Sequence, residues 1–168
     1  MKEQHLSESV IDQINQFIDQ VEQDLLNHAN VYYFKIDPEQ PHEAQISGFN
    51  GEQLDRVAKR PGVYAIWVRT SAAITPQYIG HTAGSTARSR LINHFFKKHP
   101  RTGSQLANVK KAVVARHTVG FTFVALYPPL IRLYVESALI ARHRELCVWN
   151  IHSKGAKRKS TIPQSLQG

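Results

Sequence analysis

The chain is poor in cysteine and has no long apolar run. Its one cysteine, Cys147, excludes an internal disulfide and any cysteine-based zinc cluster, and it fits a reducing compartment. No run reaches the roughly 18 apolar residues that a membrane helix requires, and the first residues lack the apolar segment of a signal peptide. We therefore expect a soluble, cytoplasmic protein without a membrane partner, whose 168 residues form one domain and an extension.

Acidic residues are scarce over most of the chain. It has 13 Asp and Glu against 21 Lys and Arg, a formal net charge of +8, but 11 of those acids lie in residues 1–60. Residues 61–168 have two acids, Glu136 and Glu145, and 16 Lys and Arg, so their net charge is +14. A segment this basic is complementary to a polyanion such as nucleic acid. The alternative is a solvated basic surface that binds no particular partner.

The acidic N-terminal part predicts a long helix, a strand and a short helix. Residues 7–29 carry apolar side chains at helical spacing, after a serine that can cap the helix. Residues 31–36 are predicted as a strand and residues 52–59 as a short helix, which Pro61 ends. The long helix has three interpretations: it packs on its own domain, it forms a dimer or partner surface, or its acids cover the basic face.

The basic part predicts the order β-β-α-α-β-α. Two runs rich in Val, Ile and aromatic residues, 61–68 and 77–80, predict a hairpin of buried strands. The later elements are predicted as helices at 85–98 and 104–115, a strand at 119–127 and a helix from Pro128-Pro129 to residue 146. We predict an α/β (α+β) fold on a small sheet. Its parts are an N-terminal extension (1–58), a main domain (59–152) and a basic tail (153–168).

Two short motifs in the predicted hairpin each place a tyrosine beside a glycine. Gly62-Val63-Tyr64 and Tyr78-Ile79-Gly80 resemble the paired signature of the GIY-YIG nuclease superfamily, with Val63 in place of the usual isoleucine. The resemblance covers about residues 60–151, because an Arg-x-x-x-His pair, a helical glutamate and a late asparagine follow in the family's order. Those residues are Arg90, His94, Glu136 and Asn150. A lysine common before the second tyrosine is absent; His81 could take over part of its role or be a surface histidine.

The residues themselves leave alternatives open. Arg90 and His94 are four positions apart and share a helix face, so each could serve a site or be an ordinary surface or core side chain. Arg88 competes with Arg90 but points elsewhere on the helix. Glu136 lies among apolar residues, so a cation must offset its desolvation. That cation is either Arg132, one turn earlier, or a metal ion.

The resemblance implies a mixed or antiparallel central sheet of three strands flanked by helices, and a divalent-metal-dependent endonuclease that hydrolyses DNA. The implied catalytic residues are Tyr64, Tyr78, Arg90, His94, Glu136 and Asn150. Glu136 would bind one Mg²⁺ or Mn²⁺ ion, since residues 61–168 lack the carboxylates of a two-metal site.

The resemblance also implies roles for the polar residues. Arg90 would bind the scissile phosphate, Tyr64 would lie nearest the attacking water, and Tyr78 would bond to phosphate or water. Asn150 would orient ligands or packing near the site. The base stays open between Tyr64, His94 as recipient of its proton, and metal-bound hydroxide, because a phenol with a pKa near ~10 is a weak base at neutral pH.

Several biological settings share this chemistry. A stand-alone, restriction-like enzyme is one of them; a repair or mobile-element nuclease and a nuclease toxin are the others. A homodimer through the N-terminal helix would help so short a chain to select its target. An alternative of another class is a nucleic-acid-binding module that has the fold but no catalysis.

Overall fold

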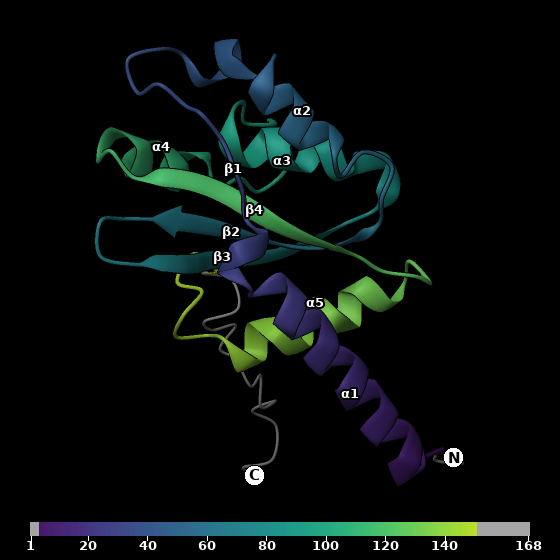
Figure 1. The fold of residues 1–168 in the computed structure, drawn as a ribbon. Coiled ribbons are helices and arrows are strands. Elements are labelled where there is room, and N and C mark those ends of the chain that lie inside the picture. Colours follow the sequence, from purple (N-terminus) through teal and green to yellow (C-terminus); the bar gives the residue numbers. More distant parts are fainter. Residues whose placement is uncertain (1–3, 151–168) are drawn as a thin grey trace, which may run out of the picture.

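A four-stranded antiparallel sheet runs through the middle of the molecule, with helices on both of its faces (Figure 1). The structure is a computed structural model and describes residues 4–150. The strand order is β1-β4-β2-β3, with β1 Tyr32–Tyr33, β2 Gly62–Arg69, β3 Ile74–Thr82 and β4 Thr118–Ala125. The α-helices are α1 Glu8–Leu25, α2 Phe49–Asp55, α3 Ala87–Phe95, α4 Leu106–Val114 and α5 Ile131–Arg142. The predicted α+β class is confirmed, while the predicted tail (153–168) lies outside the described residues.

The sheet has four strands, so the prediction of three is wrong. The fourth strand, β1, comes from the N-terminal part and pairs with β4, with Tyr32 opposite Phe121. β1 is much shorter than the predicted strand 31–36. The reason is that the Asn50 side chain occupies the hydrogen-bonding groups of the Lys35 backbone in place of a neighbouring strand. It accepts from the N–H of Lys35 (2.8 Å) and donates to its carbonyl oxygen (2.7 Å). Pairing between distant segments is not encoded in local periodicity, which is why the sequence pattern predicted a strand here but not its place in the central sheet.

The predicted order of elements in residues 61–150 is confirmed, and the predicted helices begin or end within a few residues of the observed ones. α1 ends at Leu25 instead of residue 29 because Asn27 begins a separate turn, accepting from the N–H of Ala29 at 2.9 Å. No helix within residues 4–150 is both long and apolar enough to cross a membrane.

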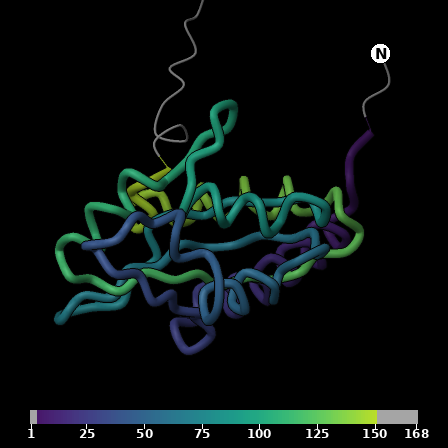
Figure 2. The backbone as a smooth tube through the Cα atoms, turned by 90° about the horizontal axis from the view of Figure 1, so that it is seen from above, coloured from purple at the N-terminus to yellow at the C-terminus, as the bar shows by residue number. Residues whose placement is uncertain are grey.

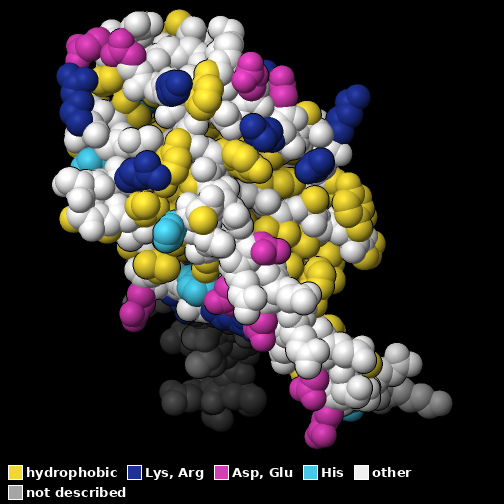
Figure 3. Space-filling view, viewed as in Figure 1, with side chains coloured by type: hydrophobic (Ala, Val, Ile, Leu, Met, Phe, Trp, Pro, Cys, Tyr) yellow, Lys and Arg dark blue, Asp and Glu magenta, His cyan; other side chains and the backbone are white. Residues whose placement is uncertain are grey.

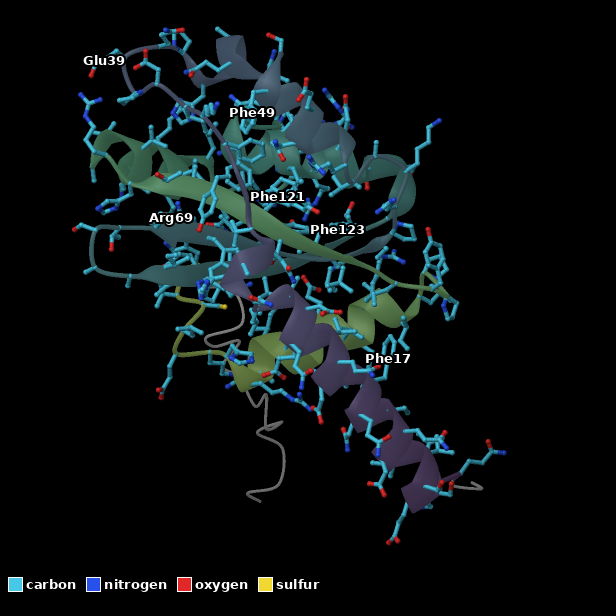
Figure 4. All side chains as sticks on the ribbon, viewed as in Figure 1. Phe17, Glu39, Phe49, Arg69, Phe121 and Phe123 are labelled. Atoms are coloured by element: carbon cyan, nitrogen blue, oxygen red, sulfur yellow. The ribbon has the colours of Figure 1, made fainter. Side chains whose placement is uncertain are left out.

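Alternate residues of β2 face the two helical layers, and this explains why residues 61–68 are continuously apolar. Tyr64, Ile66 and Val68 belong to the core under α2, α3 and α4. Val63 and Trp67 belong to the core over α1 and α5. On the first side, aromatic rings of the N-terminal part, α3 and β4 stack on one another, with Phe34 and Phe95 centred 4.7 Å apart; Figure 4 shows Phe121 on β4.

The second half of α1 packs on its own domain, as the first of the three interpretations states. Ile18, Val21 and Leu25 are buried there. The hydroxyl of Thr122 donates to the carbonyl oxygen of Leu25 (2.6 Å) and accepts from the indole N–H of Trp67 (3.0 Å). These bonds tie the end of the helix to the sheet.

The first half of α1 projects beyond the rest of the molecule (Figure 1). Leu6, Val10 and Ile11 are exposed there, and acidic side chains lie along this part of the surface (Figure 3). A homodimer through this helix would have to cover these apolar residues. The acids farther along contact α5 instead: Arg142 donates to Asp19 at 2.8 Å, and His143 contacts Glu22 at 2.8 Å.

Candidate active site

The two motif glycines leave room for neighbouring atoms. Gly80 on β3 lies opposite Tyr64 on β2, and a Cβ at Gly80 would be 2.6 Å from the Tyr64 hydroxyl oxygen. A Cβ at Gly62 would be 2.1 Å from the backbone oxygen of Val124 on β4. Real Cβ atoms do not approach other atoms so closely, so any larger residue forces the strand or the tyrosine to move. Gly80 therefore allows the Tyr64 hydroxyl to occupy the space above β3.

Three rings meet beside Gly80. Tyr64 is fully buried, and its hydroxyl oxygen lies 2.7 Å from Nε2 of His94 on α3. The ring of Tyr78, on β3, is centred 6.2 Å from that of Tyr64 and 5.3 Å from that of His94. The β2–β3 hairpin supplies both phenols, and the helix that follows it supplies the imidazole.

The hydrogen bonds of His94 define which nitrogen carries its proton. The backbone N–H of Gln105 donates to Nδ1 at 3.1 Å, so Nδ1 is an acceptor. A neutral imidazole with an unprotonated Nδ1 carries its proton on Nε2, which therefore donates to the hydroxyl oxygen of Tyr64. Burial, together with the positive charge of Arg90, lowers the pKa of His94 to about 3. His94 is thus neutral at physiological pH and is a hydrogen-bond donor to Tyr64, not a recipient of its proton.

Of the two competing arginines, Arg90 belongs to the ring cluster. Its positive charge adds to the effect of burial in lowering the pKa of His94. The same charge partly opposes the rise in the pKa of Tyr64 and of Tyr78 that burial causes. Arg90 forms no ion pair within residues 4–150, whereas Arg88 donates from Nε to Asp55 at 2.7 Å in an exposed pair. Arg90 is therefore the guanidinium available to an anion at this site.

Glu136 lies on α5, on the other side of the sheet from the three rings, and contacts β3 there. Its Oε2 lies 2.5 Å from Nδ1 of His81, the residue that follows Gly80. Its side chain is 18% exposed, and Oε1 accepts no hydrogen bond in the described part of the chain. Arg132 donates to the backbone oxygen of Pro129 instead, so the proposed Arg132–Glu136 pair is not formed.

Both phenols are neutral at physiological pH in the absence of a ligand. Burial, the neighbouring Tyr78 and the charge of Glu136 raise the pKa of Tyr64 well above the usual value, against the opposing effect of Arg90. Burial and Glu136 likewise raise the pKa of Tyr78, and Arg90 again opposes the shift. The Glu136 carboxylate is thus close enough to act on both hydroxyls.

Asn150 lies against the backbone of β3. Its Oδ1 accepts from the N–H of Ile79 (2.9 Å), and its Nδ2 donates to the carbonyl oxygen of the same residue (2.8 Å). The N–H of Trp149 donates to the carbonyl oxygen of Gln77 (2.8 Å). Residues 149–150 therefore cover the outer edge of β3 on either side of Tyr78, and Asn150 positions the strand that carries this tyrosine.

Glu136 is the residue of the candidate site that could hold a metal ion. Among residues 4–150, no three or more His, Cys, Asp and Glu side chains gather as a metal cage. Mg²⁺ commonly binds through one or two carboxylates and keeps several waters. A partly exposed carboxylate with one unpaired oxygen fits one such ion and fits neither a zinc cage nor a two-metal site.

The structure therefore brings four of the six predicted residues together, namely Tyr64, Tyr78, Arg90 and His94. It places Glu136 across the sheet, in contact with His81, and Asn150 against the backbone of β3. The sequence pattern left the role of His81 open and missed the backbone of Gln105. Neither contact can be recognised in the local sequence. His81 contacts Glu136, which is 55 positions away, and Gln105 binds His94 through its backbone N–H, which every residue except proline has. In comparisons with known proteins, no family model, no curated protein and no solved structure matches the chain.

Proposed function

We propose that the protein is a metal-dependent phosphodiester hydrolase of the GIY-YIG type that cleaves DNA in the cytoplasm. The observation that carries this proposal is the meeting of Tyr64, Tyr78, Arg90 and His94 at one point, with the charge of Glu136 acting on both phenols. A metal-assisted hydrolase needs a phosphate-binding cation, a proton acceptor and a metal-binding carboxylate. The cluster contains a group suited to each task.

Arg90 binds the scissile phosphate in this proposal. Its planar guanidinium can donate to two phosphate oxygens at once, and no carboxylate within the described residues competes for it. Tyr78 adds a hydroxyl donor beside it. An ion bound at Glu136 would supply positive charge to the phosphate oxygens in the transition state.

Tyr64 activates the attacking water. The Nε2–H of His94 already donates to the Tyr64 oxygen, so the hydroxyl's own proton is directed away from the imidazole. To act as a base, the phenol first releases that proton to solvent, and the phenolate then accepts a proton from the attacking water. The Nε2–H bond stabilises the negative charge of the phenolate, because hydrogen bonds to charged groups are the stronger ones. The positive charge of Arg90 acts in the same direction. His94 is thus a positioning residue and a donor to the base.

Cleavage of supercoiled plasmid in Mg²⁺, with a chelator control, tests the proposal. Glu136→Gln keeps the shape of the side chain and removes its charge, and we expect at least about 10²-fold slower cleavage with unchanged DNA binding. Glu145→Gln is the matched control, since Glu145 is the other acid of residues 61–168 and is exposed.

Two outcomes would contradict the proposal. If Glu136→Gln cleaves as fast as the wild type, the metal assignment is wrong. If the wild type binds DNA but cleaves neither DNA nor RNA with any divalent ion, the protein is a nucleic-acid-binding module.

A further inference from the structure

The segment between α3 and α4 projects from the molecule near residue 100 (Figure 2). All of residues 97–103 are exposed, and four of them are basic or histidine: Lys97, Lys98, His99 and Arg101. We propose that this basic loop (residues 97–103) holds duplex DNA beside the scissile phosphate. The inference rests on the proposed function, and it assigns to the site a substrate-holding element that the catalytic residues do not provide.

One buried amide fastens the basic loop near its middle and at its last residue. Asn93, which is 3% exposed, donates from Nδ2 to the carbonyl oxygen of Gly103 (2.8 Å) and accepts at Oδ1 from the N–H of His99 (2.5 Å). The hydroxyl of Ser104 also donates to the backbone oxygen of Asn93. A loop that is ordered before it meets its ligand loses less conformational entropy on binding.

The loop's charges have little to neutralise them within the protein. Residues 56–135 contain no Asp or Glu. Lys97 lies 3.6 Å from Glu43, but both side chains are largely exposed, and such pairs contribute little. Lys98 and Arg101 form no ion pair among residues 4–150. The loop therefore presents cations to an anionic partner from outside.

The two ends of the loop lie at the wall of the candidate active site. α3 ends one residue after His94, and the chain returns at Gln105, whose N–H bonds to the same imidazole. The side chain of Gln105 donates to the backbone oxygen of Trp149 (3.4 Å), next to Asn150. Nucleic acid that places a phosphate on Arg90 therefore lies beside the base of the loop.

The composition of the loop favours a duplex held by its backbone. Residues 97–103 include no Phe, Tyr, Trp, Leu, Ile or Met, so the loop lacks the large side chains that most often stack on single-stranded bases or unstack a duplex. Lysines make point contacts with phosphates, and the Arg101 fork can contact phosphate or the edge of a guanine. The major groove, about 12 Å wide, admits a protruding element of this kind.

The test compares two triple variants that remove the same charge. Lys97→Ala/Lys98→Ala/Arg101→Ala alters the loop, and Lys110→Ala/Lys111→Ala/Arg116→Ala alters three exposed cations on and after α4. Affinity for a labelled DNA duplex is measured by fluorescence anisotropy with chelator present, over a range of NaCl concentrations. Single-turnover cleavage in Mg²⁺ at saturating duplex is measured in parallel.

We expect the loop variant to bind the duplex at least about 10-fold more weakly, with a salt slope reduced by about 2 to 3, because each lost phosphate contact removes close to one counterion. The control variant should lose less than about 3-fold. Cleavage at saturating duplex should be unchanged in both, because the residues at the scissile phosphate are retained.

Equal losses in the two variants, wild-type affinity in the loop variant, or tighter binding of RNA or single strands would each overturn the inference. The proposed function fails separately. If Glu136→Gln cleaves normally while the loop variant binds poorly, the catalytic assignment is wrong and the loop assignment stands.

Discussion

His94 shows how one backbone hydrogen bond determines the chemistry of a side chain. The sequence suggests an imidazole that takes a proton from Tyr64. The N–H of Gln105 occupies Nδ1, and burial beside Arg90 lowers the pKa to about 3, so the imidazole instead gives a hydrogen bond to the phenol. The protein thereby keeps its buried histidine neutral and fixes its tautomer, and in the proposed mechanism Tyr64 is the group of the pair that exchanges a proton with water.

The first prediction concerns the Tyr64 hydroxyl. Tyr64→Phe removes only the oxygen, and we expect single-turnover cleavage to fall at least about 10²-fold, the usual contribution of a general base. The substitution also leaves the Nε2–H of His94 buried without a partner, which should lower the free energy of unfolding by about 1–3 kcal/mol. Tyr127→Phe, at a tyrosine that is 66% exposed, is the control for loss of a phenol. Cleavage by Tyr64→Phe at the wild-type rate would remove Tyr64 from the mechanism.

The second prediction concerns stability in acid. The unfolded chain takes up the His94 proton near pH 6.5, whereas the folded protein does not take it up until about pH 3. Between these values the unfolded state binds more protons, so the free energy of unfolding falls as the pH falls, by up to about 1.4 kcal/mol per pH unit.

Urea unfolding at a series of pH values across this window measures the effect. His94→Gln should show a shallower dependence on pH than the wild type, while His28→Gln, at an exposed histidine, should match the wild type. The lowered pKa of Glu22 adds an acid dependence that all three proteins share. Equal slopes in His94→Gln and the wild type would contradict the buried, neutral state of His94.

At the scale of elements, the outer edge of β3 is completed by a segment from the far end of the described chain. Residues 149–150 bond to Gln77 and Ile79, the two neighbours of Tyr78. An edge strand has unpaired backbone groups that leave it free to shift or to pair with another chain. Covering this edge holds the Tyr78 backbone in register with β2, and the geometry of the ring cluster depends on that register.

The third prediction tests this edge. Asn150→Ala removes both bonds to Ile79, and we expect the free energy of unfolding to fall by about 1–3 kcal/mol and the Ile79 amide to exchange faster with deuterium. Cleavage should slow as well, because Tyr78 is no longer held in place. Asn15→Ala, at an exposed position of α1, is the control. Undiminished protection of the Ile79 amide in Asn150→Ala would show that the edge is held by other contacts.

The same edge illustrates what the sequence could and could not predict. The apolar runs of β2 and β4 and the spacing of Arg90 and His94 are local patterns, and they predict elements and shared faces. The contacts of Asn150 with Ile79, of His81 with Glu136 and of Tyr32 with Phe121 join residues more than 50 positions apart. Periodicity carries no information about such partners. They follow from how the layers pack, and for that reason the pairing of β1 with the central sheet was not predicted.

At the scale of the whole molecule, charge is divided along the chain. Ten of the 11 acids of the first 60 residues lie in α1, α2 and the segments between them; Asp19 and Glu22 pair with α5, and Asp55 pairs with Arg88. Tyr64, Tyr78, Arg90 and His94 come from a stretch without acids, residues 56–135. This distribution makes the side of the molecule that carries Arg90 and the basic loop complementary in charge to an anionic partner.

The last prediction follows from that distribution. If Arg90, Lys97, Lys98 and Arg101 each contact a phosphate, the plot of log affinity against log salt concentration should have a slope of about −3.5 or steeper, since each contact contributes close to −0.9. The measurement is the affinity for a DNA duplex in chelator over a range of NaCl concentrations. Glycerol at matched osmolality is the control, and it should leave the affinity nearly constant. A slope close to zero would mean that uncharged contacts hold the duplex. The basic surface would then have no part in substrate binding, even if Glu136→Gln abolishes cleavage.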